Sequence, residues 1–326
     1  MVLALSLGLH HWWRPAWRTA LGAPAAALVC VAVAVTIVLL ARLLINVNNF
    51  RLSWRARGVA PACHALTPVT AARLIAHEFL SSMLTSSWYM LRPVGLRLHA
   101  PAHGSPELPA LPGLPELSAP LSVQPAPLPV SPALPVLLVH GYACNSGYWR
   151  PMSKLLTGAG ISHYGIDLEP PGAGIDDFVP QVHAGVERLC AATGSTQVIV
   201  LAHSMGGLVA RAYLRRHGAA RIARVITLGT PHQGTVLAGF GPGSNAVQMR
   251  RDSAWLAALA AGEANLQRKL FSSIYSVHDN IIAPQNSSEL PGARMVVFGA
   301  IGHVALGRHP EIMRCALAEI KSATPA

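Results

Sequence analysis

Residues 196–218 read TQVIVLAHSMGGLVARAYLRRHG, and this stretch decides the fold class. It opens as a short apolar run typical of a buried strand and continues as a helical stretch. Ser204 stands between the two, at a strand-to-helix turn that presents its hydroxyl at the end of a sheet. Such a turn needs small residues two positions before and after the serine, and these are Ala202 and Gly206. The stretch therefore predicts Ser204 as a nucleophile; the alternative is a serine that only caps a helix.

Short apolar runs alternate with helical stretches on both sides of this turn. Strands are predicted at 135–139, 163–168, 196–202, 224–229, 272–277 and 293–299, and helices around 175–192, 206–217 and 309–321. This alternation indicates an α/β fold with a mostly parallel sheet covered by helices on both faces. About 190 residues are enough for one such domain with a substantial core.

A second turn, His140-Gly141-Tyr142, follows the first predicted strand. In folds with this kind of serine turn, the loop at that place supplies one backbone N–H of an oxyanion hole, and the residue after the serine supplies the other. We therefore expect the N–H groups of Tyr142 and Met205 to converge on a substrate carbonyl oxygen. Donors of this kind contribute about 2.7–4 kcal/mol each where they have been measured.

A serine hydroxyl needs a base to take its proton and an acid to hold that base in one tautomer. In this fold the acid follows the serine and the histidine comes last. Four acidic residues lie in that window, namely Asp252, Glu263, Asp279 and Glu289. Asp279 alone directly follows a predicted strand, so it is the predicted acid. His303, in a Gly-His loop after the last strand, is the predicted base, and His309 before Pro310 is expected to cap a helix.

The remaining histidines have simpler expected roles. His140 is expected to shape the oxyanion loop, His203 and His232 to bond to loop backbone, and His278 to support the neighbouring acid. The five cysteines lie far apart without a Cys-x-x-Cys pair, and no histidines have metal-ligand spacing. We expect neither a metal nor another cofactor.

Five motifs between residues 136 and 306 carry a resemblance to a known family: LLVHGYACNSGYW, VIVLAHSMGGLVARAYL, VITLGTPHQGT, SIYSVHDNIIAP and VVFGAIGHVAL. Together they resemble the α/β-hydrolase superfamily, and more closely bacterial triacylglycerol lipases and related membrane-associated esterases. The resemblance implies the roles given above for Ser204, Asp279, His303, Tyr142 and Met205. It also implies carboxylic esters, including acylglycerols, as substrates. The first 135 residues have no counterpart in typical secreted lipases.

The N-terminal part contains an apolar run from Ala20 to Ala41, which is 22 residues without a charge. A membrane-spanning helix needs about 20 residues, and Trp and Arg residues flank the run on both sides as interfacial anchors do. We therefore expect residues 1–60 to form a single-pass membrane anchor; the alternatives are a cleaved signal peptide and a buried core helix. The amino terminus, Arg14 and Arg18 on one flank nearly balance four Arg on the other, so the orientation in the membrane stays open.

Two further segments are expected to join the anchor to the catalytic domain at 136–326. Thr67-Pro68 predicts a helix start within a helical connector at 61–100. Residues 101–135 hold eleven prolines and are expected to form an extended linker. A catalytic domain that begins near Leu134 would then fold alone, unless the 67–90 helix supplies part of its core.

The segment 234–270 is an insertion between two predicted strands on the side of the serine. It is expected to cover an acyl pocket as a cap that includes its apolar WLAALAA portion. The alternative is an ordinary crossover helix on the sheet.

Charge and composition exclude several function classes. The net charge is +11, but residues 1–77 hold seven Arg and no acid, which leaves 18 basic against 14 acidic residues downstream. No basic stripe is evident there, so we expect no nucleic-acid partner. The predicted function is a membrane-anchored serine ester hydrolase acting on a small-molecule or lipid ester. A thioesterase, an amidase or a non-catalytic membrane-anchored binding protein of the same fold are the alternatives.

Overall fold

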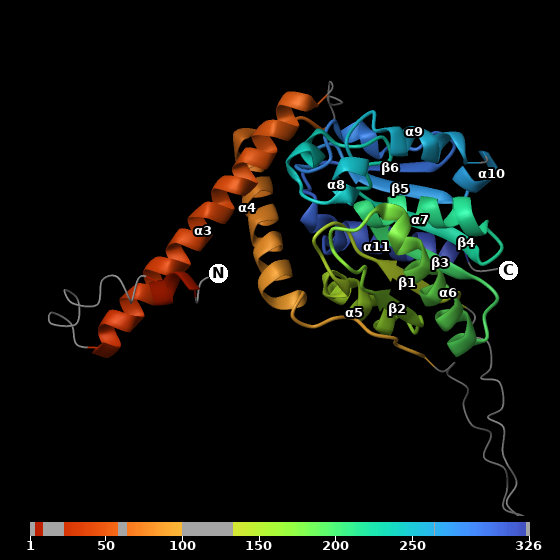
Figure 1. Ribbon diagram of the computed structural model, residues 1–326, viewed down its shortest axis with the longest axis horizontal. Helices are drawn as coiled ribbons and strands as arrows, with labels where there is room; N and C mark the ends of the chain where they lie inside the picture. The colour runs from red at the N-terminus through yellow and green to blue at the C-terminus, as the bar shows by residue number, and fades with distance from the viewer. Residues whose placement is uncertain (1–3, 9–22, 58–63, 100–132, 264, 324–326) are drawn as a thin grey trace, which may run out of the picture.

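The computed structural model describes residues 4–8, 23–57, 64–99, 133–263 and 265–323. After residue 132 the chain forms a six-stranded sheet in which all neighbouring strands are parallel, in the order β2-β1-β3-β4-β5-β6 (Figure 1). The strands are β1 Val136–Val139, β2 His163–Ile166, β3 Val198–His203, β4 Ile222–Leu228, β5 Phe271–Ser276 and β6 Arg294–Phe298. The six predicted strands are confirmed, with ends that differ by at most two residues.

Helices cover both faces of the sheet, as predicted. On one face α6 (Val179–Thr193) and α7 (Met205–His217) pack against β1 to β4, and on the other face lie α5 (Arg150–Gly158) and α11 (Pro310–Ser322). Because successive residues of a strand point to opposite faces, β1 divides its side chains between two cores. Leu137 and Val139 join the core under α6 and α7, while Val136 and Leu138 join the core under α5 and α11.

Shorter elements complete the domain. The helices are α8 Ser244–Gln248, α9 Ala254–Ala261 and α10 Asn265–Arg268. The single turns of tighter 3₁₀ helix are η3 Ser146–Trp149, η4 Ile175–Phe178, η5 Val236–Phe240, η6 Gln285–Ser288 and η7 Val304–Gly307.

Two N-terminal helices lie beside this domain (Figure 1). The first, α3 (Ala23–Ala56), continues well beyond the predicted end at Ala41. It is long and apolar enough to cross a membrane, and only 11% of its most apolar 18-residue window is buried. This exposure argues against a buried core helix. A signal sequence can have the same length and hydropathy, so that alternative remains. Figure 1 shows its first half extending away from the domain.

The second helix, α4 (Pro68–Leu84), starts at the predicted cap. Thr67 Oγ1 accepts a hydrogen bond from the N–H of Thr70 at 3.2 Å. The chain then passes through one π-helical turn, η2 (Thr85–Tyr89), and runs along the domain to residue 99. The linker predicted at 101–135 lies outside the described residues, except for its last three.

The segment after α4 is packed tightly on the domain. Asn145 Nδ2 donates to the carbonyl of Met90 at 2.8 Å, and the N–H of Val94 donates to Ser146 Oγ at 3.1 Å. Gly147 touches the backbone of Tyr89 so closely that a Cβ there would lie 2.2 Å from its carbonyl oxygen. These contacts pack the end of the 67–90 region on the domain, and Val94, just beyond it, belongs to the core under α5 and α11.

Candidate active site

Ser204 lies at the carboxyl end of β3, in the turn that leads into α7. Its φ of +54° and ψ of −125° form a backbone conformation that residues with a side chain rarely adopt. Its N–H donates to the carbonyl of Leu228 on β4 at 2.9 Å, which ties the turn to the sheet. Gly206 is required here, because a Cβ at this position would lie 2.6 Å from the carbonyl oxygens of both Val139 and His140. The local geometry is that of a strained strand-to-helix turn around a buried serine that lines a cavity.

The predicted oxyanion loop lies directly against this serine. A Cβ on Gly141 would be 2.8 Å from Ser204 Cβ. Met205 is the first residue of α7, so its N–H belongs to the helical turn that has no acceptor within the helix. Tyr142 and Ser204 line the same cavity.

His140 shapes this loop, as expected. Its Nε2 accepts a hydrogen bond from the N–H of Leu168 at 2.9 Å, and its Nδ1 lies 2.8 Å from the carbonyl of Gly141. The ring is therefore a neutral imidazole with its proton on Nδ1. Burial lowers the pKa of His140, which is consistent with a neutral ring.

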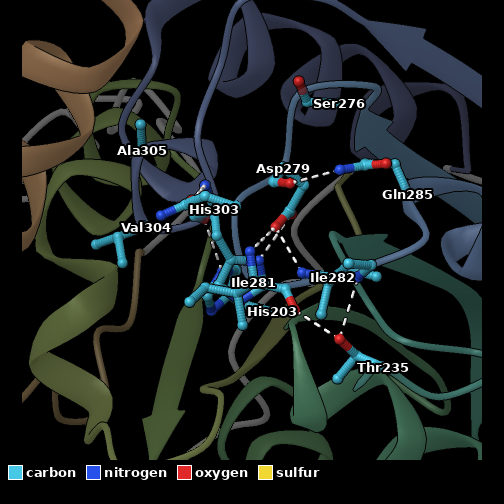
Figure 2. A network of polar contacts seen from close by, with 12 residues as sticks. His203, Thr235, Ser276, Asp279, Ile281, Ile282, Gln285, His303, Val304 and Ala305 are labelled. Atoms are coloured by element: carbon cyan, nitrogen blue, oxygen red, sulfur yellow. Dashed lines mark hydrogen bonds and ion pairs between the residues drawn. The ribbon is translucent and has the colours of Figure 1, made fainter. Parts of the chain in front are cut away.

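Asp279 and His303 form a buried, hydrogen-bonded pair (Figure 2). Asp279 Oδ2 lies 2.8 Å from His303 Nδ1, and Asp279 Oδ1 accepts the N–H groups of Ile281 and Ile282 at 2.8 Å each. The carboxylate thus holds the proton of the imidazole on Nδ1 and leaves Nε2 as the basic nitrogen. Burial is the largest single effect on the pKa of His303 and lowers it, but the Asp279 carboxylate and, to a smaller extent, the Glu78 carboxylate together outweigh it, and the net pKa is raised.

The five predicted site residues all lie at the edge of the sheet where its strands end. Asp279 and His303 are in direct contact. In the described part of the chain, Ser204 Oγ has no hydrogen-bond partner. In structures without substrate, catalytic hydrogen bonds often form only when the substrate binds.

Other histidines hold the loop that carries His303. The ring of His203 stacks on Tyr148 at 4.2 Å between centroids, and His203 Nε2 bonds to the carbonyl of His303 at 3.1 Å (Figure 2). His278 Nδ1 accepts the N–H of Ala300 at 3.0 Å, so it supports the loop that carries His303 rather than Asp279 itself. For His232 the prediction of a bond to backbone is wrong: its Nε2 bonds to the Thr227 hydroxyl at 3.2 Å.

A cavity of about 550 Å³ opens beside Ser204 and is lined mainly by apolar side chains. One of its walls comes from α3, through Ile45, Asn48, Asn49 and Leu52. These residues have no predicted role in the site, because they lie beyond the apolar run that ends at Ala41 and belong to none of the motifs. A cavity of this size and composition suits an extended apolar group.

The insertion after β4 divides into two parts. Its first part, between Thr235 and Met249, lines the cavity, and the Tyr142 hydroxyl donates to the carbonyl of Pro242 at 2.7 Å. The WLAALAA portion forms α9, which packs on α7 and α8, and its residues Leu256 and Leu259 are buried and join the core cluster to which α7 also contributes. The prediction that this portion belongs to the cap is wrong, because its apolar side chains are buried against the domain core, as in a crossover helix.

Comparison with known proteins supports this architecture. Residues 135–264 match the family described as alpha/beta hydrolase fold. The curated triacylglycerol lipases of Pseudarthrobacter phenanthrenivorans and Burkholderia plantarii are each 35% identical to this chain over 119 residues. The matches cover 32% of this chain and 35% and 32% of the relatives, so the chain spans about a third of the length of the curated relatives it matches.

Solved structures share the fold. Bacillus licheniformis lipase BlEst2 in its mature form has a TM-score of 0.52 at 18% identity, covering 60% of this chain and 96% of that chain. Aspergillus fumigatus lipase B has a TM-score of 0.51 at 19% identity, covering 58% of this chain and 52% of that chain. At such identities the likeness shows the fold alone. The part of the chain after residue 132 therefore has the α/β-hydrolase fold, and within it residues 135–264 are similar to the alpha/beta hydrolase family.

Proposed function

We propose that this protein is a serine hydrolase that cleaves carboxylic esters with Ser204 as nucleophile, His303 as base and Asp279 as the acid that orients the base. The observation that carries the proposal is the buried 2.8 Å contact between Asp279 and His303, at the sheet edge where Ser204 stands in its strained turn. The contact between Asp279 and His303 is the acid–base half of the arrangement that serine catalysis requires. The contact between Ser204 Oγ and His303 Nε2 is proposed to form when substrate binds.

The reaction follows from these positions. Ser204 Oγ attacks the ester carbonyl carbon while its proton passes to His303 Nε2, and the backbone N–H groups of Tyr142 and Met205 stabilise the resulting oxyanion. The carbon–oxygen bond to the alcohol breaks, and the alcohol leaves with the proton from His303. Water, deprotonated by the same imidazole, then attacks the acyl-enzyme, releases the carboxylic acid and restores the serine.

The substrate is an ester with an apolar acyl group, because the cavity beside Ser204 is mostly apolar. Acylglycerols fit this description, and the curated relatives are named triacylglycerol lipases. The proposal extends to a single-pass membrane anchor formed by α3, whose exposed apolar surface would be covered by lipid.

A panel of p-nitrophenyl esters of increasing chain length, with the matching thioesters and anilides, tests the proposal on detergent-solubilised full-length protein. We expect ester hydrolysis that Ser204→Ala abolishes, with the thioesters and anilides turned over more slowly. Faster turnover of the thioesters or anilides would make the protein a thioesterase or an amidase. No turnover of any of them, with wild type equal to Ser204→Ala, would contradict the catalytic function.

A further inference from the structure

Helix α4 places a carboxylate directly behind the loop that carries His303. Glu78 is fully buried, and its two oxygens accept the N–H groups of Val304 and Ala305 at 2.8 and 3.0 Å. These two residues follow His303 immediately, and Figure 2 shows them beside it. An N-terminal helix thus bonds to the catalytic loop across 226 positions of sequence.

The loop is shaped to admit this carboxylate. A Cβ on Gly302 would lie 2.5 Å from Glu78 Oε2, so only glycine allows the approach. The N–H of His303, the residue after Gly302, donates to Asn280 Oδ1 at 3.0 Å. Side chains from two distant segments therefore fix three consecutive amides, those of residues 303 to 305.

We infer that Glu78 is a positioning residue for His303: it holds the base loop in place, and its negative charge stabilises the imidazolium that forms when His303 takes the proton of Ser204. The inference rests on the proposed function. Two orienting carboxylates would then act on one base, Asp279 by direct contact and Glu78 through the backbone and across space.

The groups around Glu78 determine its pKa and therefore the pH range in which it is charged. Burial raises its pKa to about 7, although the bonds from Val304 and Ala305 and the nearby His303 work in the opposite direction and Asp279 adds to the rise. The Tyr148 hydroxyl also faces it from η3, and burial keeps that hydroxyl neutral by raising its pKa. On α4 itself the adjacent His77 packs against His309, and Arg308 lies nearby.

Above its pKa of about 7 Glu78 is mainly ionised, and this is the form that accepts two N–H groups best. Its charge then adds to that of Asp279 in raising the pKa of His303. Replacing it by a neutral side chain of the same shape should therefore lower the pH at which the base becomes active. The amide of Gln would also turn an N–H₂ group toward one of the two loop donors, which should misplace the base.

The test compares Glu78→Gln and Glu78→Asp with wild type as detergent-solubilised full-length protein. The kcat for p-nitrophenyl butyrate is measured from pH 5 to 9 and normalised to the sites that a fluorophosphonate labels. We expect Glu78→Gln to lower kcat by roughly tenfold or more at nearly unchanged KM and to move the acid-side midpoint to lower pH. Glu78→Asp keeps the charge, so its midpoint should stay close to that of wild type.

Glu319→Gln is the matched control. Glu319 is also a buried carboxylate, but it accepts from Arg224 and Ser272 near the amino ends of the strands, far from the catalytic edge. The Glu319→Gln variant should have a lower melting temperature than wild type and an unchanged pH midpoint. The inference is wrong if Glu78→Gln behaves in the same way.

If Glu78→Gln does not fold, Gly302→Ala decides, because its Cβ must displace the carboxylate. A lower kcat with a lower midpoint would support the inference, and a wild-type profile would overturn it. Undiminished hydrolysis by Ser204→Ala would instead overturn the proposed function itself.

Discussion

Helices α3 and α4 lie side by side next to the same domain, but they reach the catalytic edge in different ways (Figure 1). α3 lines the cavity with four side chains, Ile45, Asn48, Asn49 and Leu52. α4 instead places one carboxylate, that of Glu78, against the backbone of the loop that carries His303, the proposed base. A wall residue acts on how the substrate binds, while a residue behind the base acts on proton transfer. Substitutions in α3 should therefore change KM and chain-length preference, and those in α4 should change kcat and its pH dependence.

The two helices also differ in what stabilises them. Most apolar side chains of α3 are exposed, among them Leu40 and Leu44. Such a surface needs a further apolar environment, which the proposed membrane supplies. α4 is held by contacts to the domain, so it should remain in place in detergent.

Asp279→Asn should cause the largest loss of kcat. This loss is the reference against which the loss in Glu78→Gln, on α4, is compared. An amide cannot keep the imidazole proton on Nδ1, so kcat should fall by a factor on the order of 10⁴. Steady-state hydrolysis of p-nitrophenyl butyrate measures it. Near-normal activity in Asp279→Asn, with Asp252→Asn inactive, would assign the acid to Asp252. A smaller loss of kcat in Glu78→Gln than in Asp279→Asn would show that the direct contact of Asp279 with His303 matters more than the bonds of Glu78 to the loop backbone.

Deleting the residues before Leu134 should have the next largest effect. It removes Glu78, the contacts of Met90 and Val94, and one cavity wall. We expect mostly aggregated protein, with any soluble fraction turning over p-nitrophenyl butyrate roughly a hundredfold more slowly. Size-exclusion chromatography and active-site titration check this.

A deletion that starts the chain at Leu40 is the control, since it keeps the cavity wall and α4. It should fold in detergent with wild-type kcat. A fully active protein that begins at Leu134 would show that neither helix is part of the site.

Leu52→Trp tests whether α3 acts on substrate binding and not on proton transfer. The larger side chain fills part of the cavity, so kcat/KM for p-nitrophenyl laurate should fall by roughly tenfold relative to the butyrate. The acid-side pH midpoint should not move. Leu44→Trp, on the exposed surface of the same helix, should leave the ratio unchanged. A shift of the pH midpoint in Leu52→Trp would contradict the division of roles.

The smallest expected effect is the shift of the pH midpoint of the wild-type protein from the reference pKa of histidine. His303 must be neutral to accept a proton, and its pKa is raised, chiefly by Asp279. Activity should therefore be lost as the pH falls through a midpoint above the reference value of about 6.5. The kcat of p-nitrophenyl butyrate hydrolysis against pH gives this midpoint. A flat profile between pH 5 and 8 would argue against a histidine base.

The strands and the helices on the sheet could be predicted because each carries a local signal, such as alternating apolar runs or the small residues around Ser204. Asp279 and His303 were found by chain order and by their place after strands. Glu78 could not be found this way, since its partners are two backbone amides far along the chain and its helix has no motif. The sequence also does not show that only the first part of the insertion lines the cavity. An apolar stretch such as WLAALAA is expected both in a cap and in a crossover helix.

The central claim is that Ser204 is the nucleophile of an ester hydrolase, and covalent labelling tests it most directly. The detergent-solubilised protein is treated with a fluorophosphonate and digested with trypsin, and the peptide 189–211 is sequenced by mass spectrometry. We predict one adduct, on Ser204, that appears in step with the loss of p-nitrophenyl butyrate hydrolysis and is absent from Ser204→Ala. An adduct on another residue, or equal labelling of Ser204→Ala, would contradict the claim.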